Sequence, residues 1–409
     1  MISFVRIICF AFCLLAYGCF GAYLDYQAST PCDPRVVKAM EAFLYANPAN
    51  PHGAGVQHKR ALAAVNLARR QIADLIHAKP DEIIFTSGAT ESNNLAIQGI
   101  AKAYAHKGRH IITCAIEHKS VLEVMRHLEQ HGFTVTYLPV QANGILDIRK
   151  LKKAIRPDTI LVSIMAVNNE IGVIQPIGKI GQICRSRRVQ FHCDGAQAVG
   201  KISVDVRYID ALSISGHKMY TPKGIGALYV RKGIEIAPIM FGGGQQDGVR
   251  PGTLPVPLCV ALGSACDVCK KSLKEENKRI AHMQQRLLQR LKKLFVKVVV
   301  NGDLKKRIPG NLSIQLSKID TDEIVRLLPN FAISVASSCY GQGQTSHVLQ
   351  ALPNVSSKNT LRIGLGRFTT GKDIDIFTQA LAQVVQRIKR AKTPAQENYE
   401  LLSKAASSI

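Results

Sequence analysis

The sequence predicts an α/β fold with a mostly parallel sheet, followed by a second, smaller α+β domain. Two patterns support this prediction. Short apolar runs alternate with helical patterns over residues 56–230, and a long amphipathic stretch begins after Pro255 and Pro257. The length agrees with it, because 409 residues exceed what one hydrophobic core usually serves. With 46% apolar and 20% charged residues, the composition excludes a disordered or fibrous protein.

The first half of the chain reads as repeated strand–helix–strand units. Residues 56–77 carry apolar side chains at helical spacing, among them Leu62, Val65 and Ile72. Predicted strands follow at residues 83–85, 111–113, 135–137, 160–164, 189–192, 212–214 and 227–230, and further helices at 91–106, 120–131 and 177–187. Such units place helices on both faces of the sheet and ligands at the carboxyl ends of the strands.

The second half has a different pattern. An amphipathic helix is predicted over residues 258–294, strands over 296–300 and 312–316, and a closing helix over 373–388. We therefore expect a large domain at 23–256, a smaller one at 257–392, and a tail at 393–409 that is either polar or a peripheral helix.

Residues 1–22 form a hydrophobic leader. The run 7–22 carries no charge; it is short for a membrane-spanning helix and suits the core of a signal peptide. Secretion or anchoring, an upstream extension and a membrane-touching leader stay open. We expect a cytoplasmic protein in which membrane contact or export would involve only this leader.

The chain is strongly basic. Its 53 Lys and Arg residues outnumber 29 Asp and Glu, giving a formal charge of +24, which favours acidic partners or anionic surfaces. The basic groups at residues 150–153, 185–188, 292–293 and 305–307 are scattered and lack interleaved aromatic residues. We read them as solvated helix faces and do not expect direct nucleic-acid binding.

The 11 cysteines are odd in number and follow no regular framework, which indicates a reducing compartment. Cys266 and Cys269 form a lone C-x-x-C inside an apolar helical pattern, so buried thiols are favoured over zinc ligation. The histidines show no paired ligand spacing, and no metal site is predicted.

Three loops that follow predicted strands carry reactive side chains. Residues 86–93 open a helix with small residues, either as a phosphate cup or as an ordinary capped helix. Lys218 follows Ser215, Gly216 and His217 and is either solvated or a Schiff-base nucleophile. Asp194 is either a turn residue or the partner of a cationic ring nitrogen. Together, a phosphate cup, a strand-end Asp and a strand-end Lys, in this order along the chain, are what pyridoxal 5′-phosphate (PLP) requires.

From Tyr23 to about Arg390 the sequence resembles the cysteine desulfurases of the NifS and IscS type. These are class V aminotransferase-like enzymes of the fold-type I PLP-dependent transferases. The matching stretches are collinear and lie at residues 23–31, 47–52, 86–94, 117–120, 168–172, 194–197, 215–218, 250–255 and 361–368.

The resemblance implies a role for each matching site residue. Lys218 would bind PLP and move the Cα proton, His118 would stack over the pyridine ring and assist proton transfer, and Asp194 would pair with the ring nitrogen. A homodimer is implied as well, because one phosphate ligand comes from the partner subunit. The remaining cofactor residues implied are Gln197 at the phenolic oxygen, Ala89, Thr90, Ser215 and His217 at the phosphate, and Thr253 from the partner subunit.

The implied substrate is L-cysteine, which is converted to L-alanine. Asn169 and Arg362 match the residues that hold its carboxylate, and Cys339 matches the thiol that accepts the sulfur as a persulfide. The alternative for Cys339 is a buried structural thiol. Val335 and Ala336 depart from the family's usual Ser-Gly step before this cysteine. The family passes sulfur to iron–sulfur scaffold proteins or tRNA-thiolation carriers.

Two other functions stay open from the sequence. One is a related enzyme of the same fold, an aminotransferase or a selenocysteine lyase. The other is a catalytically silent fold that binds a partner, although Lys218, His118 and Asp194 argue against it.

Overall fold

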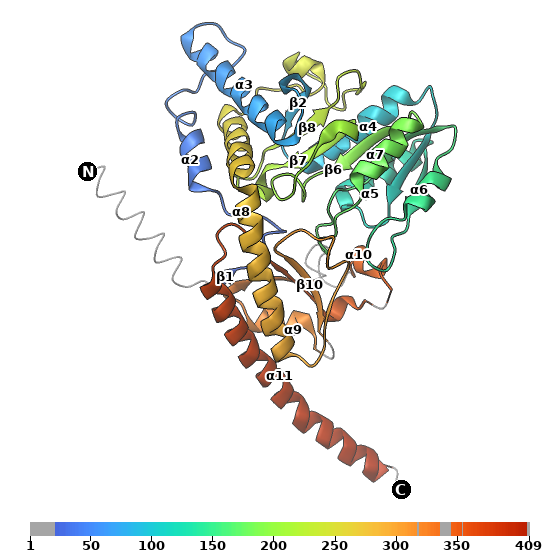
Figure 1. Cartoon of the computed structure of the whole chain (residues 1–409), viewed down its shortest axis with the longest axis vertical. Coiled ribbons are helices and arrows are strands. Elements are labelled where there is room, and N and C mark those ends of the chain that lie inside the picture. The colour runs from blue at the N-terminus through green and yellow to red at the C-terminus, as the bar shows by residue number, and fades with distance from the viewer. Residues whose placement is uncertain (1–20, 317–318, 336–344, 354, 407–409) are drawn as a thin grey trace, which may run out of the picture.

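The computed structural model describes residues 21–406 apart from 317–318, 336–344 and 354. Its body contains a seven-stranded sheet in the order β2-β8-β7-β6-β5-β3-β4 and a four-stranded sheet in the order β12-β13-β10-β9 (Figure 1). The predicted fold class, a mostly parallel α/β part with a smaller α+β part, is confirmed.

The large sheet contains every strand predicted between residues 83 and 230. Its pairs are parallel except where β8 lies between β2 and β7, with which it is antiparallel. The strands are β2 (Ile83–Thr86), β3 (His110–Cys114), β4 (Thr134–Leu138), β5 (Thr159–Ser163), β6 (Gln190–Asp194), β7 (Ala211–Ser215) and β8 (Gly226–Val230).

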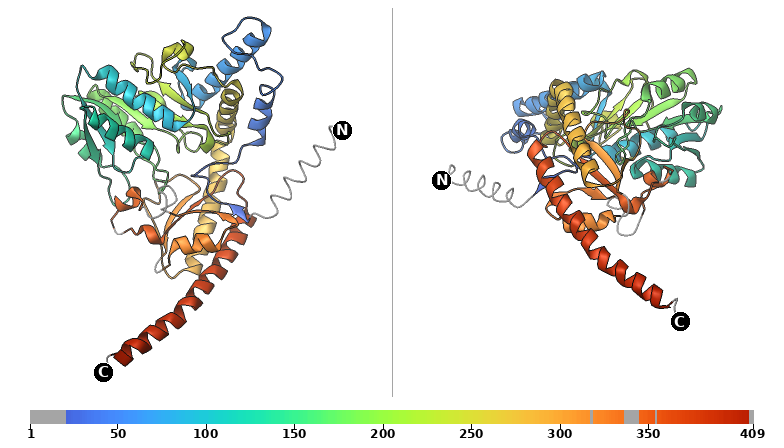
Figure 2. Two further views of the ribbon diagram at one scale, coloured as in Figure 1. Left: turned by 180° about the vertical axis from the view of Figure 1, so that it is seen from behind. Right: turned by 60° about the horizontal axis from the view of Figure 1, so that its bottom comes forward.

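Helices cover both faces of this sheet (Figure 2). Because successive residues of a strand point to opposite sides, each strand contacts both helix layers. On β3, Ile111 packs toward α4 (Ala89–Tyr104) and α5 (Lys119–Gln130). The next residue, Ile112, belongs to the core on the other face, which also contains residues of α7 (Ile177–Ser186) and, farther along the sheet, of α3 (Val56–Ile76). The strands are therefore apolar on both faces, as the sequence predicted.

The small sheet is antiparallel and includes β9 (Val298–Val300) and β10 (Asn311–Leu316) where strands were predicted. β12 (Ser334–Val335) and β13 (Thr360–Gly364) complete it, and β1 (Ala22–Tyr23) pairs with β11 (Phe331–Ala332) beside it. The shorter helices are α2 (Pro34–Glu41), α6 (Ile148–Ala154), α9 (Thr321–Leu327) and α10 (His347–Gln350). The closing helix, α11 (Gly371–Ala406), is longer than the predicted 373–388.

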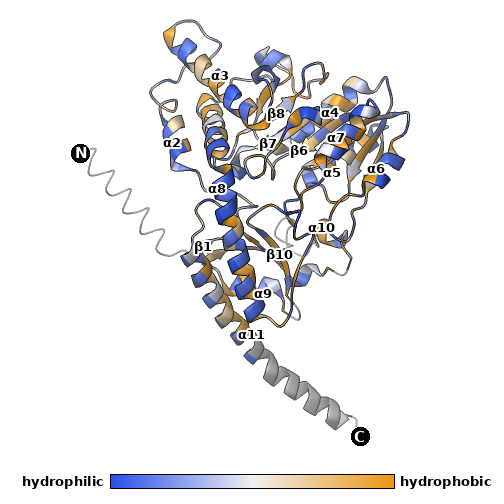
Figure 3. Cartoon of the chain, in the orientation of Figure 1, coloured by the Kyte–Doolittle hydropathy of each residue, from blue (hydrophilic) through white to orange (hydrophobic). Residues whose placement is uncertain are grey.

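The helix α8 (Val256–Leu294) runs from the large sheet to the small one (Figure 3), and its side chains belong to both hydrophobic cores. Its first half contributes Cys259 and Leu262 to the core under the large sheet, and its second half contributes Met283 and Leu287 to the core of the small one. The domain boundary expected at residue 256 thus falls at the start of a shared element and stays a prediction.

Two further sequence interpretations concern the described residues. Cys266 and Cys269 are buried, and burial raises the pKa of both thiols, which confirms them as buried thiols. In the described part of the chain, no helix is both apolar enough and long enough to cross a membrane. Residues 1–20, most of the predicted leader, lie outside the described residues; Ala22 already packs in the small-domain core.

Candidate active site

Five strands of the large sheet end at the same edge, and the predicted site residues follow these ends. His118 comes after β3, Asn169 after β5, Lys218 after β7, and Thr90 after β2, while Asp194 is the last residue of β6. They line one cavity of about 480 Å³. The predicted residues that line it are Ala89, Thr90, His118, Asn169, Asp194, Gln197, Ser215, His217, Lys218 and Arg362.

Gly226 allows two of the loops to approach each other. It is the first residue of β8 and pairs with Thr86 on one side and Ser215 on the other. A Cβ atom at Gly226 would lie 2.6 Å from the Cα of Gly88 and 2.5 Å from the carbonyl oxygen of Ile214. Only glycine fits there, and the phosphate cup therefore lies directly beside the loop that carries Lys218.

The amine of Lys218 and the amide of Gln197 converge on one carbonyl oxygen. Lys218 Nζ donates to the oxygens of Gln27 and Ala28, both at 2.6 Å, and Gln197 Nε2 donates to the oxygen of Gln27 at 2.8 Å. These contacts bring the lysine and glutamine that the resemblance assigned to the cofactor to one side of the cavity.

Lys201, which sequence reasoning missed, supports the cavity residue Gln197 from outside the cavity lining. Its Nζ donates to Gln197 Oε1 at 2.6 Å, and burial lowers the pKa of the amine to about 7. With its oxygen held by Lys201, the Gln197 amide keeps its NH₂ group on the cavity side. Lys201 lies four residues after Gln197 in the sequence. This spacing could have indicated the contact, because residues so spaced share a face where the segment turns.

Asp194 is buried, with 5% of its surface exposed, and is held by two donors. Its Oδ1 accepts from the backbone N–H of Ala196 at 2.9 Å, and its Oδ2 accepts from Asn93 Nδ2 at 2.8 Å. These bonds hold the carboxylate at the end of β6, facing the cavity.

His118 caps the N-terminus of α5. Its Nδ1 lies 3.1 Å from the backbone nitrogen of Ser120, which donates to it, and 2.8 Å from Ser120 Oγ. Surrounding protein atoms lower the pKa of His118; the charge of Asp194 opposes this and that of Lys218 adds to it, and the net downward shift favours the neutral imidazole.

Arg362, on β13, reaches the cavity from the small sheet. It forms an ion pair of 2.9 Å with Asp25 and also donates to Ser334 Oγ at 2.9 Å and to the carbonyl oxygen of Asn169 at 3.3 Å. The two residues expected to hold the substrate carboxylate are therefore in contact. Asp25, which sequence reasoning did not single out, orients the guanidinium.

Beneath Asp194, β6 carries a buried imidazole that belongs to the sheet. His192 lies between β5 and β7, with Nδ1 2.8 Å from Ser163 Oγ and Nε2 3.0 Å from Ser213 Oγ. Burial lowers the pKa of His192 from 6.5 to about 4. Between pH 4 and 6.5 the folded protein thus keeps this ring neutral, whereas the ring in an unfolded chain would be protonated.

We expect His192 to make the fold acid-sensitive. Because the pKa of His192 is lower in the folded state, its contribution to the free energy of unfolding is fully present above pH 6.5. That contribution, about 3 kcal/mol, is lost as pH falls toward 4. Urea unfolding at several pH values should show that the free energy of unfolding falls less steeply with pH in His192→Gln than in wild type. Equal dependence of the two free energies on pH would contradict the assignment.

Two predicted residues are not brought to the cavity by the described part of the chain. Thr253 is exposed and does not line it. Its implied role requires a second copy of the chain and stays a prediction. Cys339 lies outside the described residues, between Val335 and Thr345. Its role as the sulfur acceptor likewise stays a prediction.

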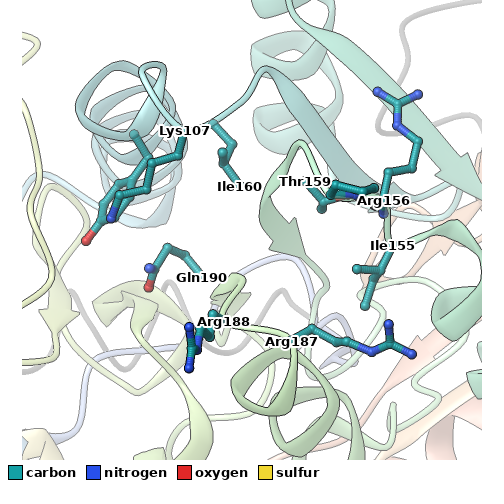
Figure 4. Close-up of a pocket in the computed structure, with 10 residues that line it drawn as sticks. Lys107, Ile155, Arg156, Thr159, Ile160, Arg187, Arg188 and Gln190 are labelled. Carbon is teal, nitrogen blue, oxygen red and sulfur yellow. Dashed lines mark hydrogen bonds between the residues drawn. The ribbon is translucent and has the colours of Figure 1, made fainter.

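A separate basic cavity of about 350 Å³ lies at the opposite edge of the sheet (Figure 4). Thr159 and Gln190, which line it, begin β5 and β6. None of the predicted site residues lines it. Its cations are exposed, and one of them, Arg156, is paired with Asp158. The titratable and nucleophilic groups of the candidate site lie instead at the carboxyl edge.

The family model for aminotransferase class-V matches residues 22–377. Human cysteine desulfurase is 46% identical over 375 residues, which cover 90% of this chain and 82% of the human protein. The chain belongs to the cysteine desulfurases of this family. Cysteine desulfurase IscS of Ehrlichia chaffeensis is 47% identical over 377 residues, covering 90% of this chain and 92% of its own.

Solved structures agree with this assignment. A structure described as a NifS-like protein superposes with a TM-score of 0.84 at 33% identity, covering 89% of this chain and 99% of its own. The desulfurase resemblance that the sequence motifs carry is therefore confirmed. Within the described residues, no group of three or more His, Cys, Asp or Glu side chains could hold a metal ion.

Proposed function

We propose that this cysteine desulfurase uses PLP to convert L-cysteine to L-alanine and transfers the sulfur to Cys339 as a persulfide. The observation that carries the proposal is the convergence of Lys218, Asp194, Gln197 and the Gly88 loop on one cavity. An amine for the aldehyde, a buried carboxylate for the ring nitrogen and a cup for the phosphate fit this cofactor. The cavity volume is in the range of small-molecule sites.

Each side chain has a separate task. When bound, PLP supplies an electron sink for the negative charge left on Cα of the substrate. Lys218 would hold the cofactor through Nζ and take up the Cα proton. Asp194 would keep the ring nitrogen protonated, and Gln197 would donate to the phenolic oxygen. His118, neutral and at the cavity wall, would move a second proton.

Arg362 and Asn169 orient the substrate. A guanidinium suits a planar carboxylate because it donates two parallel hydrogen bonds, and Asp25 holds it in place on one side. Asn169 is fixed by its neighbour Asn168, whose Oδ1 accepts from the backbone N–H groups of Glu170 and Ile171, both at 2.9 Å.

The transfer of sulfur to Cys339 requires no external oxidant. The Cys339 thiolate attacks the sulfur of the substrate, the Cβ–S bond breaks, and an S–S bond forms. The electron pair stays on the carbon fragment, which takes up a proton and leaves as L-alanine. The sulfur then passes to an iron–sulfur scaffold protein or a thiolation carrier. We include a homodimer in the proposal, with Thr253 of each copy serving the other's site.

The test measures alanine and sulfide formed from L-cysteine in the presence of a thiol reductant. Cys339→Ser is expected to lower both rates by about 100-fold or more, because the positioned nucleophile is lost. Cys32→Ser is the matched control: Cys32 is the exposed thiol among the described free cysteines and lies outside the cavity. Equal activity of Cys339→Ser and wild type would remove the persulfide mechanism.

A further inference from the structure

Asn93, on α4, connects two residues of the cavity that lie on different elements, Asp194 at the end of β6 and Ser120 in the first turn of α5. It is fully buried. Its Nδ2 donates to Asp194 Oδ2 at 2.8 Å and to Ser120 Oγ at 2.8 Å. The amide orientation is fixed, because a carboxylate only accepts hydrogen bonds and would repel the amide oxygen. Both protons of the NH₂ group are therefore in use.

The direction of the next hydrogen bond follows from this. Ser120 Oγ accepts from Asn93, so its own proton is available for His118 Nδ1, 2.8 Å away. The backbone N–H of Ser120 donates to the same nitrogen at 3.1 Å. With two donors directed at it, Nδ1 carries no proton, and the proton of the neutral ring is on Nε2.

We propose that Asn93 and Ser120 are positioning residues that hold His118 in its Nε2–H tautomer and join it to Asp194. This rests on the proposed function for its catalytic meaning. His118 then carries its N–H on Nε2, so this nitrogen is a hydrogen-bond donor and cannot act as a base. The ring-nitrogen partner and the hydrogen-bond-donating imidazole are fixed by one buried amide.

A purely structural explanation for this network would be helix capping. The backbone bond from Ser120 to Nδ1 is sufficient for that role, and it involves neither Asn93 nor Asp194. The link from Asn93 to Asp194 joins two segments 101 residues apart and does nothing for the cap. A measurement of the ring's protonation state therefore distinguishes positioning from capping.

The test is ¹⁵N NMR of the full chain with bound PLP, labelled at histidine, in wild type, Asn93→Leu, Ser120→Ala and Ser120→Thr. The chain has 12 histidines, and His118→Gln assigns the signal. Wild type is expected to show Nε2–H at His118. Asn93→Leu and Ser120→Ala leave the backbone N–H of residue 120 as the one fixed donor to Nδ1, so both should show a larger share of the Nδ1–H tautomer than wild type. Ser120→Thr, which keeps the hydroxyl, should resemble wild type.

Turnover gives the second readout. We expect Asn93→Leu to lower kcat by about tenfold with little change in KM, since one hydrogen bond to a charged group is lost. The control is Asn94→Leu on the same helix, whose amide bonds only Thr90 O and Gln98 in the described residues. A circular dichroism melt checks folding; should Asn93→Leu not fold, Ser120→Ala alone decides.

Two results would overturn the inference: an Nδ1–H signal at His118 in wild type, or unchanged His118 signals in the variants that fold. The spectrum does not depend on turnover. A chain that forms no alanine from cysteine but shows the expected tautomers would therefore overturn the proposed function and leave the network standing.

Discussion

Lys218→Ala is expected to abolish alanine and sulfide formation, with kcat/KM lower by about 10⁴-fold or more. The reason is positional. Lys218 lies directly after β7, with its amine held at 2.6 Å by the carbonyl oxygens of Gln27 and Ala28. The variant loses both the covalent hold on the cofactor and the base for the Cα proton. Product assays and the visible absorption of the bound cofactor measure the two losses separately.

The comparison for this variant is Lys223→Ala, a second lysine that lines the same cavity but is exposed. We expect it to lower kcat/KM by less than about tenfold, because a solvated lysine contributes little beyond its charge. Added ethylamine should partly restore Lys218→Ala. If that variant kept a tenth or more of the wild-type rate, the assigned role of Lys218 would be wrong.

The largest expected effect on stability belongs to Arg367→Met. Arg367 forms ion pairs of 2.8 Å with Asp33 and with Glu276, and its guanidinium lies 4.1 Å from the centroid of the Tyr220 ring. Both carboxylates are nearly enclosed, with 1% and 13% of their side-chain surfaces exposed. Removing the cation takes away the ion pair of Glu276 and leaves the buried Asp33 with the exposed Arg35, which we expect to lower the free energy of unfolding by about 3–5 kcal/mol.

Arg35→Met is the matched control for this change. Arg35 pairs with the same Asp33 at 2.7 Å, but 60% of its side chain is exposed, so its loss should cost less than about 1 kcal/mol. Hydrogen bonds from Arg35, with Arg367 beside them, hold the pKa of Asp33 well below its usual range. Urea unfolding compares the two variants, and equal losses would show that burial does not decide the effect.

The sheet was predictable because its strands are apolar on both faces. Ile111, Ile112, Leu161 and Val162 are fully buried, and such runs stand out in the sequence. The antiparallel direction of β8 could not be predicted, because the order and direction of strands depend on contacts between residues far apart in the chain. α2 was missed although Asp33 caps it and Pro34 begins it, a signal that was present.

The site was predictable only as a set of separate loops. Lys218 and His118 follow strands and Asp194 ends one, and the edge of the sheet brings them together. The hydrogen bonds and ion pairs that connect the loops could not be predicted. Asn93 bonds Asp194, and Asp25 pairs with Arg362, between segments that are far apart in the sequence and carry no local signal. Lys201 was overlooked because a lysine is usually solvated, whereas here it supports Gln197.

The 39-residue helix α8 serves two interiors in succession. Any cut along it would strip apolar side chains of their neighbours in one half of the enzyme or the other. The two halves are therefore unsuited to separate expression. Arg362 comes from the small sheet but lines a cavity formed mostly by the large one, and α8, which packs against both, fixes its position.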